Sequence, residues 1–292
     1  MKPAPFEYVR PQSLAEACAI LAGNEDARVI AGGQTLVPML AMRLARPSIL
    51  VDILRLPGLS GIRRDADALR VGATTRQAEA EHSALVASAL PLLFAALPWV
   101  GHSPTRNRGT VGGSLANADP SAEIPLVAVT LEAEILTEDE GGPMSTPADD
   151  FFIGPMVTAA PPGGLLTSVH FPVWTDPRIG VGFQEVSARR SDFAFASAAA
   201  QVAMEEDGTC NRIALGIGGV GDRPSKLDMS GLLGTRLEEA RVAEAVAAAA
   251  ADLDATSDLH ASADYRRRVA CLLGARAISD AIADAQAKGD RR

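Results

Sequence analysis

The chain has 292 residues, of which 47% are hydrophobic and 22% are charged. This composition excludes an intrinsically disordered chain, and the length predicts about two globular domains. The formal net charge of -9 repels phosphate backbones, so we expect no nucleic acid among the partners.

The N-terminal residues and the cysteines indicate the cellular compartment to expect for this protein. Residues 1–20 lack the apolar segment and cleavage site of a secretory signal, and no apolar run is long enough to predict a transmembrane segment. The three cysteines, Cys18, Cys210 and Cys271, are odd in number and widely spaced. They predict neither a disulfide framework nor a metal site, so a cytoplasmic location is expected.

The first third of the chain predicts alternating helices and strands. In chain order we expect a helix from the N-cap Ser13 to Gly23, a strand at 27–33, a helix at 34–45, a strand at 48–54, antiparallel strands about a turn at 65–68, and helices at 75–97 broken at Pro91.

The pattern of predicted elements changes after Pro177, which marks the expected domain boundary. Before it we expect a buried helix running into a strand at 122–138, a turn-rich surface excursion at 138–151, and a strand at 165–172. After it we expect an antiparallel meander at 181–224 with a turn at Asp207 and Gly208, then helices at 237–253 and 263–285. The last helix is predicted to place Tyr265, Val269, Leu272, Leu273 and Ile278 on one face.

A first glycine-rich segment, "VIAGGQTL", joins a predicted strand to a predicted helix. Glycines let the backbone approach a phosphate closely, and the free N–H groups of a helix start point at it. An anion-binding turn and a purely structural turn both fit these residues. A Rossmann site is excluded, although Asp52 ends the next strand, because the third glycine of G-x-G-x-x-G is missing.

A second segment, "GTVGGSLANADPSAEIP", combines glycines with short polar side chains and leads into an apolar helix. Thr110, Ser114, Asn117, Asp119 and Glu123 offer both donors and acceptors to a polar ligand. Two separate glycine segments suit a long, bent ligand with a diphosphate at one end and a polyol or ring at the other. FAD has that shape.

Six motifs occur in order between residues 5 and 278: "AGGQTLVPML", "RVGATTRQAE", "RNRGTVGGSLANADPSAEIP", "FQEVSARRSDFAFASAAA", "LGIGGVGDRP" and "YRRRVACLLGARAI". Together they resemble the FAD-binding medium subunit of the molybdenum hydroxylases, which include aerobic carbon monoxide dehydrogenase and the bacterial xanthine dehydrogenase type. The resemblance implies an α+β fold. A two-subdomain FAD-binding region of the PCMH type is expected at 1–176, divided at about residue 57. A C-terminal domain like that of the CO dehydrogenase flavoprotein, with a three-stranded antiparallel sheet and helices, is expected at 177–292.

Carried over onto this sequence, the resemblance and the polar residues of the second segment give one expected set of cofactor contacts. It consists of Ala31, Gly32, Gly33, Gln34, Thr35, Leu36, Thr110, Val111, Gly112, Gly113, Ser114, Asn117, Asp119, Glu123, Leu166 and Gln184. The turn at 31–35 is expected to hold the FAD diphosphate, and Glu123 or Asp119 to approach the ribityl chain. No catalytic residue and no metal ligand is assigned.

The resemblance also implies the function and the partners. Electrons are expected to pass from a molybdopterin-binding large subunit, through a [2Fe-2S] small subunit, into FAD and on to an external acceptor. The expected assembly is a dimer of heterotrimers, with the molybdenum cofactor and the iron–sulfur clusters held by the other chains. The sequence names neither the substrate nor the acceptor.

Two departures from the family pattern bear on this expectation. Pro104 and Thr105 stand in place of the first residues of a QIRN-type sequence, and Gln184 stands where xanthine-type members carry a lysine. The second change argues against a xanthine-specific assignment.

Three alternatives remain open on the residues alone. They are a free-standing FAD-dependent oxidoreductase of the same fold, a hydrolase with a nucleophile elbow at 112–116, and a non-enzymatic scaffold. The elbow lacks its final glycine. The role of Arg189 and Arg190 also stays open.

Overall fold

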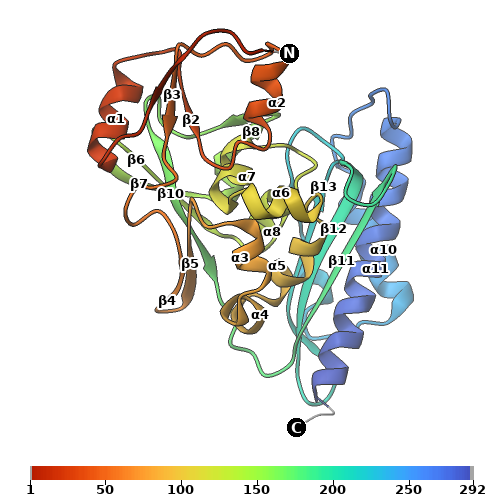
Figure 1. Ribbon diagram of the computed structural model, residues 1–292. Helices are drawn as coiled ribbons and strands as arrows, with labels where there is room; N and C mark the ends of the chain where they lie inside the picture. Colours follow the sequence, from red (N-terminus) through yellow and green to blue (C-terminus); the bar gives the residue numbers. More distant parts are fainter. Residues whose placement is uncertain (1, 290–292) are drawn as a thin grey trace.

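The computed structural model describes residues 2–289 and arranges them in stacked layers, with an N-terminal lobe at one end (Figure 1). The lobe contains a parallel sheet in the order β1-β3-β2. Its elements are β1 (Glu7–Val9), α1 (Leu14–Ala22), β2 (Ala27–Ile30), α2 (Leu36–Ala41) and β3 (Ile49–Asp52). The predicted first helix is confirmed, because the Ser13 hydroxyl accepts a hydrogen bond from the Glu16 N–H at 3.1 Å.

The second layer is an antiparallel sheet in the order β4-β5-β10-β6-β7. Its strands are β4 (Ile62–Asp65), β5 (Ala68–Gly72), β6 (Glu134–Asp139), β7 (Gly142–Pro147) and β10 (Leu165–Pro172). The expected turn at 65–68 and strand at 165–172 are confirmed. Two short strands, β8 (Phe152–Gly154) and β9 (Val157–Thr158), form a separate hairpin.

The stretch at 138–151 lies at the surface as predicted, but the prediction that it is rich in turns was wrong, because it forms β7 and the short helix α9 (Ala148–Phe151). The hairpin turn uses Gly142, whose φ of +110° suits glycine. β7 is an edge strand with prolines near its two ends, Pro143 and Pro147, and its sequence lacks alternating apolar and polar residues. Prolines are tolerated at a sheet edge but argue against a strand in the sequence, so this strand was not predicted.

A layer of helices packs against this sheet and carries the largest buried cluster (Figure 1). Its elements are α3 (Gln77–Glu81), α4 (Ala84–Ala89), α5 (Pro91–Ala96), η1 (Leu97–Trp99), α6 (Ser103–Arg108), α7 (Val111–Asn117) and α8 (Glu123–Thr130). The expected break at Pro91 is confirmed, since Pro91 begins α5. Every residue of α8 is buried, which explains its uninterrupted apolar sequence.

The C-terminal layer is an antiparallel sheet in the order β11-β12-β13-β14. The three long strands expected from the sequence are β11 (Ile179–Ser187), β12 (Ala194–Met204) and β13 (Cys210–Gly218), and a short β14 (Ser225–Leu227) extends the sheet. The predicted turn between β12 and β13 is confirmed, with Gly208 at a φ of +83°. A short helix η2 (Ser230–Leu232) follows, and the helices α10 (Glu239–Ala250) and α11 (Ala263–Gly289) complete the layer.

The face predicted for the last helix was partly wrong. Leu273 and Ile278 are buried, whereas Leu272 is 49% exposed. The stripe of α11 against the sheet is made mainly of small residues, namely Ala270, Gly274, Ala277, Ala281 and Ala285. A Cβ on Gly180 would come within 2.9 Å of the Ala285 Cβ, so strand and helix backbones approach closely. Close approach favours alanine over leucine on the buried stripe.

The opposite face of this sheet meets the helical layer, and we call this contact the domain seam. Its residues on the sheet side are Phe183, Glu185, Ser197, Gly216 and Gly218. The Phe183 ring lies 5.8 Å from the Trp99 ring, measured between centroids. Gly216 and Gly218 face α8, because a Cβ at either would contact the Leu126 side chain.

Candidate functional site

The two glycine-rich segments, far apart in the sequence, touch each other in the fold. A Cβ added to Gly32 would lie 2.7 Å from the Cα of Gly109 and would collide with the Arg108 carbonyl. Only glycine fits there without moving backbone on one side or the other. Together the two segments therefore build one site.

The first segment leaves its backbone donors open. Gly33 has a φ of +71°, and its carbonyl accepts a hydrogen bond from the Val37 N–H at 2.9 Å. The Gln34 side chain donates to the Gly32 carbonyl at 3.2 Å. In the described chain the N–H groups of Gly33, Gln34, Thr35 and Leu36 donate no hydrogen bond. Successive open N–H groups are the feature by which such turns bind anions.

The second segment contains the start of α7, a short helix that was not predicted from the sequence. Thr110 caps α7, since its hydroxyl accepts a hydrogen bond from the Gly113 N–H at 3.0 Å. The Val111 N–H donates to the Thr75 carbonyl at 2.9 Å, and the Gly112 N–H to the Ala73 carbonyl at 3.0 Å. These donors are used within the fold, so this segment offers side chains to a ligand and not a backbone cradle.

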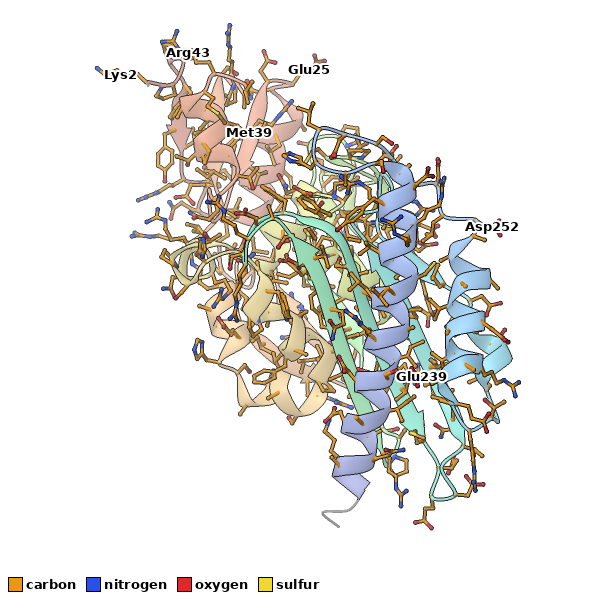
Figure 2. All side chains as sticks on the ribbon, turned by 90° about the vertical axis from the view of Figure 1, so that its right-hand side faces the viewer. Lys2, Glu25, Met39, Arg43, Glu239 and Asp252 are labelled. Carbon is orange, nitrogen blue, oxygen red and sulfur yellow. The ribbon has the colours of Figure 1, made fainter. Side chains whose placement is uncertain are left out.

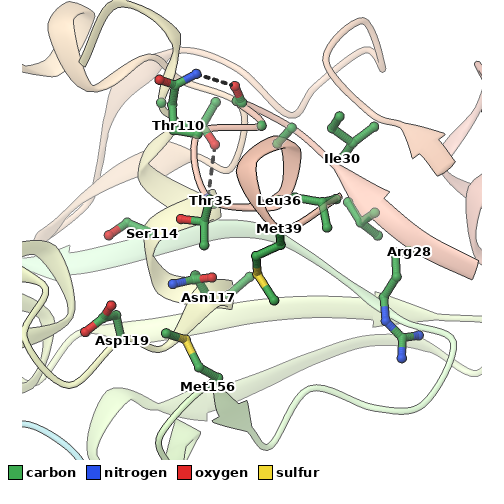
Figure 3. A pocket seen from close by; sticks show the side chains of 18 of the residues that line it. Arg28, Ile30, Thr35, Leu36, Met39, Thr110, Ser114, Asn117, Asp119 and Met156 are labelled. Atoms are coloured by element: carbon green, nitrogen blue, oxygen red, sulfur yellow. Dashed lines mark hydrogen bonds between the residues drawn. The ribbon is translucent and has the colours of Figure 1, made fainter. Parts of the chain in front are cut away.

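A cavity of about 1220 Å³ opens between the two segments, larger than the roughly 300–1,000 Å³ of ordinary small-ligand pockets. In Figure 3, Met39 and Met156 point toward each other in its middle, with Arg28 on one side and Asp119 on the other. Twelve of the sixteen predicted contact residues line it. They are Ala31, Gly32, Gly33, Gln34, Thr35, Leu36, Thr110, Gly113, Ser114, Asn117, Asp119 and Glu123.

The other four predicted residues lie outside the cavity wall. Val111 is fully buried, and a Cβ on Gly112 would lie 2.6 Å from the Ala73 Cα, so both serve the packing of α7. Leu166 is buried in the core from β10. Gln184 faces α11, where its side-chain amide donates to Asp280 at 2.5 Å.

Acidic side chains sit at the end of the cavity nearest the C-terminal domain. Burial raises the pKa of Asp119. Burial, with some repulsion from Asp119, raises the pKa of Glu123 to about 7. The ionised forms of these two carboxyl groups are disfavoured there, because the buried surroundings solvate a negative charge less well than water does.

Several wall residues were not predicted from the sequence. Gln77 is the clearest, because it is 6% exposed, lines the cavity, and its carbonyl oxygen Oε1 is buried without a partner in the described chain. Such an acceptor suits a ligand donor. Gln77 lies in the motif "RVGATTRQAE", which was the signal available in the sequence.

The tip of the β11–β12 hairpin also reaches the cavity. Ser191, Asp192 and Phe193 line it, and the Phe193 side chain is 74% exposed. Arg189 pairs with Asp192 at 3.0 Å, while both Arg189 and Arg190 are exposed. The two arginines therefore belong to a solvated turn whose other side forms the wall.

Comparison with known proteins agrees with this architecture. The family model for the FAD binding domain in molybdopterin dehydrogenase matches residues 4–174, and the model for the CO dehydrogenase flavoprotein C-terminal domain matches residues 182–281. The chain is 37% identical to the alpha subunit of the 6-hydroxypseudooxynicotine dehydrogenase complex of Paenarthrobacter nicotinovorans, over 97% of this chain and 96% of that one.

Two solved structures match over almost the whole chain. Carbon monoxide dehydrogenase from Hydrogenophaga pseudoflava superposes with a TM-score of 0.93 at 32% identity, covering 97% of this chain and 99% of that one. Quinoline 2-oxidoreductase from Pseudomonas putida 86 gives 0.92 at 36% identity, covering 98% and 99%. The similarity thus includes both domains and their arrangement.

Proposed function

The chain belongs to the family of FAD-binding subunits of molybdenum hydroxylases, and from this premise we propose that it carries electrons through FAD held in the described cavity. The observation that carries the proposal is the pair of touching glycine segments, which leaves open N–H groups beside a long cavity. Bound FAD would supply the redox chemistry, since it exchanges electrons singly or in pairs.

The residues present fit this cofactor. The open N–H groups of residues 33–36 would hold the diphosphate, which carries negative charge. Ser114, Asn117 and the acids Asp119 and Glu123 would contact the hydroxyl-bearing part. The orphaned Oε1 of Gln77 would accept a hydrogen bond from the ligand. Leu166 and Gln184 would act on FAD only through neighbouring residues, because neither lines the cavity.

We further propose the partners that the sequence predicted. The similar chain of P. nicotinovorans is named as a subunit of a dehydrogenase complex, which supports assembly with other chains. The proposed route runs from a molybdopterin-binding large subunit through a [2Fe-2S] small subunit to this chain and then to an external acceptor. A dimer of heterotrimers is the proposed assembly.

The proposed domain division is 1–176 and 177–292, with subdomains meeting near residue 57; the matched family regions end at 174 and begin at 182 on either side of it. Within residues 2–289 no helix combines the length and hydropathy needed to cross a bilayer. A cytoplasmic location stays a prediction.

The visible absorption spectrum of the purified chain tests the proposal, followed by release and identification of any bound flavin. Flavin absorption bands and non-covalent FAD are expected. Co-purification then separates the two flavoprotein alternatives: partner chains indicate the electron-transfer subunit, whereas turnover by the isolated chain indicates a free-standing oxidoreductase. A folded, colourless protein that takes up no added FAD would refute the assignment.

A further inference from the structure

A buried carboxyl group in the domain seam has no hydrogen-bond partner among residues 2–289. Glu185 lies on β11 opposite Ser197 of β12, and Ser197 in turn lies opposite Gly218 of β13. In the described chain both carboxyl oxygens of Glu185 and the hydroxyl of Ser197 are buried without a hydrogen bond. A buried carboxylate with no cation or donor is strongly disfavoured.

A second buried acid begins α8, the helix that packs against the sheet face on which Glu185 lies. Glu123 is the first residue of α8, is only 9% exposed, and forms part of the cavity wall. The segment before α8 is tied to the C-terminal sheet, because the Ser121 hydroxyl donates to the Ala194 carbonyl at 3.0 Å. The Gly219 N–H donates to the Pro120 carbonyl at 2.8 Å. These bonds hold Glu123 against the sheet that carries Glu185.

The charges around the two acids do not compensate them. Asp119, just before α8, is acidic and adds repulsion to Glu123. Arg106 of α6 attracts Glu123, but it is committed to Glu81 of α3 through bonds of 2.7 and 3.0 Å. Burial first, and repulsion from Glu123 second, raise the pKa of Glu185 to about 8.

We propose that Glu185 and Glu123 form one coupled acid pair across the domain seam, in which Glu185 is a positioning residue that tunes the charge Glu123 presents to the cavity. At neutral pH the pair retains a proton, which spares an anionic cofactor part of the repulsion from the acidic end of its cavity. The effect on the cofactor rests on the proposed function. The coupled pair itself is a property of the chain alone.

The pair predicts a distinct pH dependence of folding. A carboxyl whose pKa is raised by folding stabilises the folded state fully below its unfolded pKa, and this contribution is lost as the pH rises through the folded pKa. Each such group lowers the folding equilibrium constant about tenfold per pH unit within that window. For Glu123 the window ends at about pH 7, and for Glu185 at about pH 8.

Urea unfolding of the full-length chain between pH 5.5 and 9 tests the pair without any flavin. Glu185→Gln removes the titrating group while keeping the side-chain shape. For each pH unit, the folding equilibrium constant of the wild type should therefore fall by about ten times the factor seen in the variant. Glu239→Gln is the matched control, because Glu239 is exposed on α10 (Figure 2) and should keep the wild-type slope. An unchanged slope in Glu185→Gln would overturn the pair.

A direct titration covers the case in which Glu185→Gln folds poorly. Carbon-13 NMR of the wild-type chain labelled at the glutamate δ-carbon should show two resonances that titrate at or above pH 7. One should vanish in Glu123→Gln. A wild-type chain in which every glutamate is ionised at pH 6 would refute the proposal.

The dissociation constant of FAD, measured from pH 6 to 9, tests the effect on the cavity. Wild-type binding should weaken in two steps, near pH 7 and near pH 8, and Glu185→Gln should lack the second step. Equal profiles in both proteins would refute the tuning role while leaving the proposed function intact. Failure of every variant to bind FAD at any pH would refute the proposed function, whereas an altered folding slope would still support the pair.

Discussion

Adding one methyl group at Gly32 is expected to weaken FAD binding by about 5- to 150-fold. The new Cβ of Gly32→Ala would lie 2.7 Å from the Gly109 Cα, and the atoms it meets are backbone that no rotamer change can move. Overpacking of this kind costs about 1–3 kcal/mol. The free chain can relieve that strain by separating the turn from residues 108–109. Binding must restore the contact, so the strain appears as lost affinity at about 1.4 kcal/mol per tenfold.

Quenching of flavin fluorescence on titration with the FAD-free protein measures this loss, and far-ultraviolet circular dichroism confirms the fold. Gly58→Ala is the matched control, because Gly58 has a φ of +81° and no atom of the described residues beyond its chain neighbours lies within 4 Å of an added Cβ. It should lower stability by about 1–2 kcal/mol through left-handed strain and leave the dissociation constant unchanged. Wild-type affinity in a folded Gly32→Ala protein would refute the inference that contact between the two segments shapes the site.

Three further changes have expected outcomes. Glu81→Gln breaks a bidentate ion pair whose members are only 16% and 13% exposed, while Arg106 keeps its bonds to the Val100 and Gly101 carbonyls. The change should cost about 1–3 kcal/mol in urea unfolding, and an unchanged stability would contradict the importance of the pair. Hydrogen bonds from backbone N–H groups and from the buried Arg266 lower the pKa of Asp258 to about 2. The stability that ionised Asp258 gives the folded state is present above about pH 3.8 and should disappear as the pH falls through 2. Asp258→Asn should therefore lose less stability on acidification than the wild type, as measured by urea unfolding. Gln77→Met should weaken FAD binding about fivefold, the worth of one hydrogen bond near 1 kcal/mol, and unchanged affinity would remove Gln77 Oε1 from the ligand contacts.

The sequence predicted most of the regular elements, because their signals are local. Ser13 caps a helix, Pro91 starts one, and Gly208 turns a hairpin wherever these residues meet suitable neighbours. The predicted location of the site in the two glycine segments likewise used local chemistry. Twelve of the sixteen named residues line one cavity, since turn glycines and short polar side chains cluster where backbone must approach a ligand.

The structural reason for each glycine could not be predicted from the sequence. Gly33 needs its positive φ, whereas Gly112 is glycine because the Ala73 backbone leaves no room for a side chain. A bulky residue at Gly112 would therefore disturb the packing of α7 before it affected a ligand, so Gly112 is a poor probe of binding. Likewise Gln77 and Phe193 reach the cavity only through long-range packing, which no local pattern records.

The cavity lies where three layers meet, and each part of its wall is tied to a neighbouring layer by backbone. Gly32 rests on Gly109, and the Met156 N–H donates to the Ala118 carbonyl at 3.0 Å. The bonds around Pro120 and Ser121 join the wall to the C-terminal sheet. A ligand that contacts all three parts binds the assembled arrangement better than a separated one, and therefore stabilises it. Cofactor retention and docking of the two domains should accordingly rise and fall together, and the proposed acid pair of the domain seam should affect both.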